Sequence, residues 1–104
     1  MEKRIGLLRK KILENPQLQW TIEDMSKVIG LNIRQLQRLI KVETDTTPSV
    51  WLRDLRLEKA KQLLENTFLN IGEICLKVGL NDHSHFTRDF KDKFGVTPTS
   101  YRKT

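Results

Sequence analysis

The chain has 104 residues, of which 38% are hydrophobic and 31% charged, and its formal net charge is +6 at pH 7. This length allows one small domain or two very small ones. It has no apolar run of about 18 residues and no apolar leader after its charged N-terminus, so neither a membrane span nor a secretory signal is expected. Its single cysteine cannot form an internal disulfide and fits a reducing, cytoplasmic setting.

Helices and turns are predicted for the whole chain, because apolar residues recur at spacings of three and four and no segment alternates for long enough to form a strand. The first helix is expected over residues 3–14, with Ile5, Leu8 and Ile12 on one face. Pro16 ends it, since the residue before a proline is pushed out of the helical conformation.

A short helix, a turn and a longer helix are predicted next. Thr21 and Asp24 have the spacing of a capping box, in which each residue bonds the backbone N–H of the other. Gly30 is suited to close this short helix in the left-handed conformation. Asn32 and Gln35 then have the same capping spacing, so a third helix should start after Asn32 and run to about residue 43.

A fourth helix should open at Thr47-Pro48, since proline is favoured at the first helical position, and run unbroken to about residue 65. We expect Arg53 and Arg56 to be solvated at its surface, with phosphate contact as the alternative. The helix is also expected to have a core of its own, formed by Trp51, Leu52, Leu55, Leu57, Ala60, Leu63 and Leu64.

The pattern of the first half then returns. Asn70 and Glu73 repeat the capping spacing, and Gly79 closes a second short helix. Either Asn81 or Asp82 caps the following helix, which should run to residue 94, and a last helical turn starts near residue 98.

The two halves are therefore an internal repeat. At an offset of 49 residues, Ile22, Gly30, Leu31 and Asn32 match Ile71, Gly79, Leu80 and Asn81. At an offset of 50 residues, Leu36, Arg38, Lys41, Thr47, Pro48 and Trp51 match Phe86, Arg88, Lys91, Thr97, Pro98 and Tyr101. Each copy has the helix-turn-helix arrangement. Asp45 stands at the repeat position of Gly95, so we expect it to adopt a left-handed backbone conformation.

The second helix of a DNA-binding helix-turn-helix enters the major groove, and its exposed polar side chains meet the base edges. In the first copy the candidate DNA-binding residues are Arg34, Gln35, Gln37, Arg38 and Lys41. In the second copy they are His83, Ser84, His85, Thr87, Arg88 and Lys91. Arginine and glutamine pair bidentately with guanine and adenine, and histidine and threonine discriminate less. A polar stripe on one helix is usually a solvated face, but its repetition in register favours a shared function.

The predicted fold is all-α, with about seven helices. Residues 1–47 form a first helix-turn-helix subdomain, residues 48–66 a linking helix, and residues 67–104 a second helix-turn-helix subdomain. A helix of about 18 residues is about 27 Å long at ~1.5 Å per residue. Since major-groove sites on one face of B-DNA lie roughly 34–36 Å apart, this link suits two units in adjacent turns of one duplex.

The second half resembles the signature of the AraC/XylS family of bacterial transcription regulators. The matching residues are Ile71, Ile74, Gly79, Ser84, Phe86, Arg88, Phe90, Lys91, Gly95, Pro98, Tyr101 and Arg102. Cys75 and Leu80 stand where the family usually has Ala and Phe, which indicates repacking, and we expect Cys75 to be buried and unreactive. The first half is similar through "LNIRQLQRLIK" and "RLEKAKQLL", so the resemblance covers about residues 5–103.

This resemblance implies sequence-specific binding of double-stranded DNA in two adjacent major grooves and control of transcription initiation. RNA polymerase is a further candidate partner. Many family members also carry a separate sensing or dimerising domain, usually N-terminal. None is recognised in this sequence, which leaves open a piece of a longer regulator or a stand-alone member.

The alternative is a helical module that docks on another protein without reading DNA. Salt dependence separates the two, because phosphate contacts make affinity fall steeply with salt. Enzymatic activity and a cofactor are not expected. His83 and His85 are two residues apart and do not share a helix face, so a metal site is not expected there either.

Overall fold

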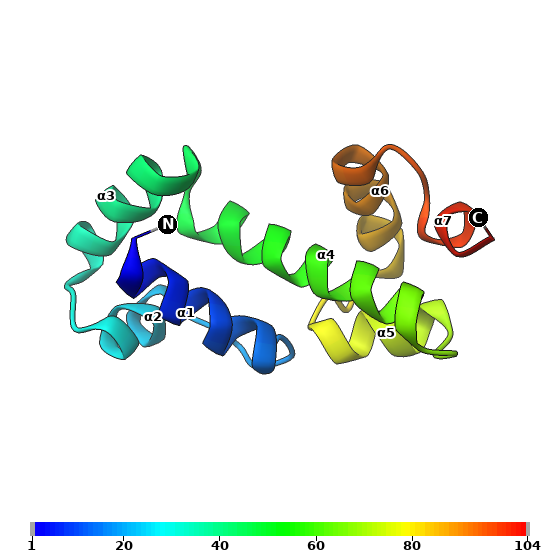
Figure 1. Ribbon diagram of the computed structural model, residues 1–104, viewed down its shortest axis with the longest axis horizontal. Coiled ribbons are helices and arrows are strands. Elements are labelled where there is room, and N and C mark those ends of the chain that lie inside the picture. The colour runs from blue at the N-terminus through cyan, green and yellow to red at the C-terminus, as the bar shows by residue number, and fades with distance from the viewer. Residues whose placement is uncertain (1, 104) are drawn as a thin grey trace.

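The computed structural model describes residues 2–103, and these residues form seven α-helices and no strand (Figure 1). The helices are α1 (Lys3–Glu14), α2 (Ile22–Ile29), α3 (Ile33–Thr44), α4 (Pro48–Asn66), α5 (Ile71–Val78), α6 (His83–Phe94) and α7 (Pro98–Lys103). The long helix α4 connects α1–α3 at one end of the molecule to α5–α7 at the other. The predicted all-helical fold, with two helix-turn-helix subdomains and an unbroken linking helix, is confirmed.

Each end of the molecule has its own hydrophobic core. The first core joins α1, α2 and α3 to the N-terminal half of α4, and its buried residues are Ile5, Leu8, Ile12, Met25, Leu36, Ile40, Trp51, Leu52 and Leu55. The second core joins α5 and α6 to the C-terminal half of α4, and its buried residues are Leu57, Ala60, Leu64, Ile74, Cys75, Val78, Phe86 and Phe90. Below, the first unit is residues 2–47 and the second unit is residues 67–103.

The expectation that α4 has a core of its own is wrong. Its buried residues divide between the two cores, with Leu55 in the first and Leu57 in the second. At about 100° per residue, two positions rotate the helix by about 200°. The two units therefore pack on nearly opposite faces of α4. The two ends of α4 are therefore apolar on different faces. In the sequence these two sets of apolar residues resemble a single wide apolar face.

Local capping explains why the helices start where they do. Thr21 and Asp24 form the predicted capping box of α2, and Asn32 and Gln35 form that of α3. The equivalent capping box in the second half is formed by Asn70 and Glu73 at the start of α5. Asp82 is the cap of α6, which decides between the two candidates, and its carboxylate accepts the backbone N–H of His85 at 3.0 Å.

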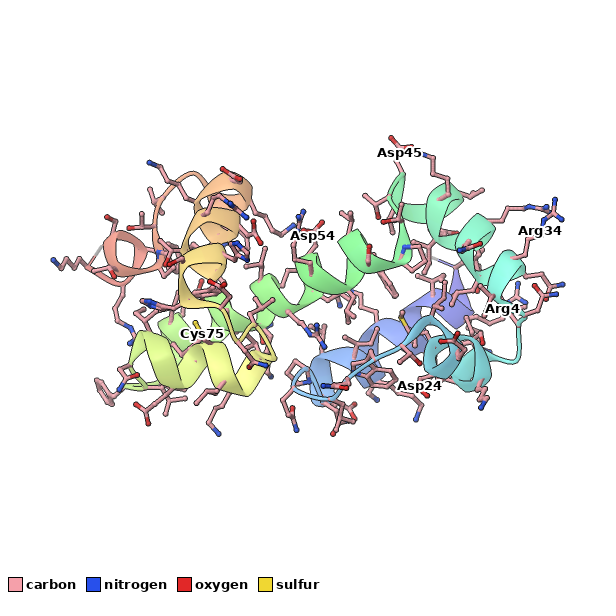
Figure 2. The ribbon with its side chains drawn as sticks, turned by 180° about the vertical axis from the view of Figure 1, so that it is seen from behind. Arg4, Asp24, Arg34, Asp45, Asp54 and Cys75 are labelled. Atoms are coloured by element: carbon pink, nitrogen blue, oxygen red, sulfur yellow. The ribbon has the colours of Figure 1, made fainter. Side chains whose placement is uncertain are left out.

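The longer helix of each unit closes at one left-handed residue. In α6 this residue is Gly95 (φ 85°), and in α3 it is Asp45 (φ 57°). The prediction for Asp45 is thus confirmed. Among the described residues Asp45 is the only residue other than glycine with a positive φ, and Figure 2 shows its side chain at the edge of the molecule.

The C-terminal end of α4 is held by a residue of α7. The guanidinium of Arg102 donates to the carbonyl oxygens of Thr67, at 3.2 Å, and Leu69, and lies within 3.4 Å of those of Leu63 and Leu64. The last carbonyls of a helix lack intrahelical N–H partners, and the guanidinium supplies donors at this end of α4. Arg102, one of the residues that carries the family resemblance, therefore joins the last helix to the linking helix.

Candidate nucleic-acid interface

The helix α3 buries Leu36 and Ile40 in the first core. Because these residues are four apart, they occupy one face and the polar residues between them turn outward. All five candidates of the first unit are exposed: Arg34, Gln35, Gln37, Arg38 and Lys41. In Figure 2 the side chain of Arg34 extends away from the body of the protein.

The exposed side chains of α3 differ in whether they already form ion pairs or hydrogen bonds within the protein. Arg34 and Arg38 have no ion pair or side-chain hydrogen bond to another residue between positions 2 and 103. Lys41 pairs with Asp45 at 3.0 Å on the surface. The side-chain oxygen of Gln35 accepts the backbone N–H of Asn32 at 3.0 Å, so this group is partly engaged in capping α3.

The helix α6 repeats this arrangement in the second unit. Phe86 and Phe90 are buried, with ring centroids 5.8 Å apart, and Thr87 is half-buried. The other five candidates are exposed: His83, Ser84, His85, Arg88 and Lys91.

Two candidates of α6 have acidic neighbours. The guanidinium of Arg88 lies 3.8 Å from the carboxylate of Asp89, and the imidazole of His85 lies 3.5 Å from that of Asp82. The hydrogen bond from the backbone N–H of His85 lowers the pKa of Asp82, so this carboxylate is ionised at neutral pH. The exposed face of α6 therefore has less free positive charge than that of α3.

The two arginines of α4 have different environments. Arg53 is exposed beside Asp54, at 3.5 Å. Arg56 is half-buried and donates to the carbonyl oxygens of Pro16, at 3.0 Å, and Leu18, at 2.8 Å. The expectation of a solvated side chain is therefore wrong for Arg56, because its guanidinium is bound to the loop that follows α1.

Sequence reasoning missed the contribution of α1 to the surface around α3. Arg4 lines a groove of about 290 Å³ together with Arg38 and Val42 of α3. Arg4 is exposed and paired with Glu2 at 2.9 Å. The helical pattern of residues 3–14 showed which residues of α1 are buried, but it had no signal for which other helix lies beside Arg4.

Comparison with known proteins agrees with this geometry. Residues 25–104 match the protein family described as a helix-turn-helix domain. The transcriptional regulator MtrA of Neisseria gonorrhoeae is 32% identical over 102 residues, which is 98% of this chain and 34% of MtrA. A transcriptional regulator of Chromobacterium violaceum with an AraC-type DNA-binding domain has 30% identity and a TM-score of 0.89, over 96% of this chain and 89% of that one.

The chain belongs to the AraC-type helix-turn-helix family. The DNA-binding domain of AdpA, solved in complex with a target DNA, has the same fold, with a TM-score of 0.83 and 22% identity over 98% of this chain and 92% of that one. This AraC-type domain is thus a DNA-binding domain of a family of transcription regulators. It spans 34% of the length of MtrA and 24% or less of three other curated relatives. No helix within residues 2–103 is long and apolar enough to cross a bilayer.

Proposed function

We propose that this AraC-type domain binds double-stranded DNA sequence-specifically in two adjacent major grooves, with α3 and α6 as its two reading helices. The observation that carries the proposal is the repeated placement of these helices. Each has 12 residues, is preceded by an eight-residue helix, and turns its polar side chains outward. A surface that only contacts solvent has no need of such a repeat. Binding to two equivalent major grooves does need it, because each groove requires its own helix.

The size of the molecule supports binding across one helical turn. The linking helix α4 has 19 residues, so its length is about 28 Å at ~1.5 Å per residue. The longest dimension of the Cα trace is 42 Å, and the other two are 22 Å. Major-groove sites one turn apart are separated by roughly 34–36 Å, which lies within that longest dimension.

The contacts with DNA are proposed to be of two kinds. Arg34, Gln37 and Arg38 of α3 read base edges, because their side chains are exposed and suited to bidentate pairing. The six candidates of α6 add affinity and register: His83, Ser84, His85, Thr87, Arg88 and Lys91. The net charge of +6 adds a general attraction to phosphate.

The role in the cell is proposed from the relatives. MtrA is a transcriptional regulator, and on this basis the domain would control transcription initiation in a bacterial cytoplasm. RNA polymerase and a sensing or dimerising domain are the proposed protein partners. An enzymatic role is not part of the proposal.

Selection of binding sites from a pool of random duplexes tests the proposal. We expect enrichment of one sequence with two conserved segments, and an affinity for it that falls linearly with the logarithm of salt concentration. A protein-interaction module would enrich no sequence and would show no such salt dependence.

A further inference from the structure

The two units come into close contact beside the middle of α4. The turn that follows α5 begins at Gly79 (φ 78°), and this residue faces Pro16 and Gln17 of the loop after α1. A Cβ atom on Gly79 would lie 2.9 Å from the carbonyl oxygen of Pro16 and 3.3 Å from the Cα of Gln17. Only glycine allows the two backbones to come this close.

Arg56 of α4 holds the loop in this position. Its guanidinium donates to the carbonyls of Pro16 and Leu18, and its Nε would lie 3.2 Å from a Cβ on Gly79. The same carbonyl of Pro16 thus accepts from Arg56 and abuts Gly79. Arg56, the loop and the turn form one contact, which we call the Arg56 bridge.

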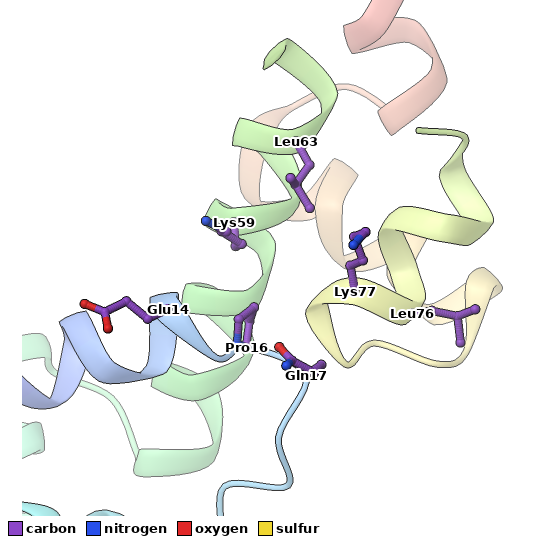
Figure 3. Close-up of a pocket in the computed structure, with 7 residues that line it drawn as sticks. All are labelled: Glu14, Pro16, Gln17, Lys59, Leu63, Leu76 and Lys77. Carbon is purple, nitrogen blue, oxygen red and sulfur yellow. The ribbon is translucent and has the colours of Figure 1, made fainter. Parts of the chain in front are cut away.

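An open groove between the units adjoins the Arg56 bridge. It has a volume of about 480 Å³ and is lined by Glu14, Pro16, Gln17, Lys59, Leu63, Leu76 and Lys77 (Figure 3). Figure 3 shows Pro16 and Gln17 where the first unit approaches α4 and α5. The bridge is therefore a direct contact between the units beside this groove.

The turn that contains Gly79 leads within four residues into α6. The position of α6 relative to the first unit therefore depends on this turn, which rests on the Pro16 loop, as well as on the packing of α6 against α4. We infer that Arg56 and Gly79 are positioning residues that set the separation of the two reading helices, and so the spacing between the two DNA segments that the domain accepts. This inference rests on the proposed function, since it concerns how the two grooves are bound together.

The test compares duplexes in which the two selected segments keep their spacing or are moved apart by one base pair. For the unchanged domain we expect the insertion to weaken binding by about tenfold, since both segments can no longer meet their helices. Arg56→Met should bind the original duplex more weakly and lose clearly less on insertion, because the units are free to adjust. Lys59→Met is the matched control, since it removes one positive charge from the same helix three residues on, and it should keep the tenfold preference.

A second pair of variants covers the case in which Arg56→Met does not fold. Gly79→Ala and Gly30→Ala alter equivalent positions of the repeat, and both residues are left-handed, with φ of 78° and 67°. They share the backbone strain, but a Cβ on Gly30 meets no atom within 4 Å. Only Gly79→Ala should change the preferred spacing.

Two results overturn the inference. One is an unchanged spacing preference in Arg56→Met, and the other is a similar change in Gly79→Ala and Gly30→Ala. If the spacing preference of Arg56→Met is unchanged and its salt dependence falls by about one ion, while that of Lys59→Met does not, Arg56 is a phosphate contact instead. If the unchanged domain selects no duplex at all, the proposed function fails instead.

Discussion

At the scale of single residues, Asp45 holds a backbone conformation that a glycine holds at the matching position of the repeat. The left-handed conformation costs most residues about 1–2 kcal/mol, and less for aspartate. Asp45→Gly should therefore raise the free energy of unfolding by about 0.5 kcal/mol, after the loss of the exposed ion pair with Lys41. Urea titration measures this change.

Asp45→Asn separates the backbone effect from the ion pair, because asparagine tolerates the left-handed conformation and has no charge. We expect this variant to be within about 0.5 kcal/mol of the unchanged protein. If Asp45→Gly and Asp45→Asn were both clearly less stable than the unchanged protein, the carboxylate, and not the backbone, would decide the preference at this position.

Cys75 is 3% exposed in the second core, which confirms that it is buried, and its lack of reactivity remains a prediction. Burial raises the pKa of its thiol, so little of the reactive thiolate is present at pH 7. A thiol reagent should label Cys75 only as fast as the protein unfolds. Ser100→Cys supplies an exposed internal control that should react at once, and equally rapid labelling of both cysteines would refute the prediction.

At the scale of elements, two asparagines at equivalent positions of the repeat should contribute differently to the free energy of unfolding. Asn32 is the cap of α3, whereas its aligned partner Asn81 precedes the cap of α6, which is Asp82. Asn32→Ala and Asp82→Ala should each lower the free energy of unfolding by about 1 kcal/mol, because each leaves a backbone N–H without its acceptor. Asn81→Ala should have almost no effect on the denaturation midpoint. A large loss in Asn81→Ala would place the start of α6 one residue earlier.

The two reading helices should also contribute differently to DNA recognition. Arg38→Ala should weaken binding to the selected site by ~1–3 kcal/mol and relax the preference at one or two base positions. Arg88, already beside Asp89, should act mainly on phosphate, so Arg88→Ala should weaken selected and scrambled duplexes alike and reduce the salt dependence by about one ion. Titrations of both duplexes at several salt concentrations measure both effects, and the reverse pattern would exchange the two roles.

The starts and ends of the helices could be predicted closely because their signals are local. Capping residues lie three positions apart in the chain, and Pro48 and Gly95 act on their immediate neighbours. The partners of Arg56 could not be predicted, because Pro16 and Leu18 lie 40 and 38 residues away in the chain. The side-chain faces of α3 and α6 followed from their apolar spacing, whereas the position of Arg4 beside α3 depended on how α1 packs.

At the scale of the whole molecule, α4 decides how the two units are combined. Its two halves bury opposite faces, so each unit has a separate core but shares a rigid helix with the other. We therefore propose that the chain is one DNA-binding device, in which both reading helices occupy major grooves of the same duplex face.

Methylation interference on the selected duplex tests this claim most directly, because methylation of guanine N7 blocks contacts in the major groove. We predict two groups of interfering guanines on one face of the duplex, separated by about 10–10.5 base pairs. Arg38→Ala should weaken interference in only one of the two groups, the one contacted by α3. A single group of interfering guanines, or two groups on opposite faces of the duplex, would show that α3 and α6 do not occupy adjacent major grooves of one face.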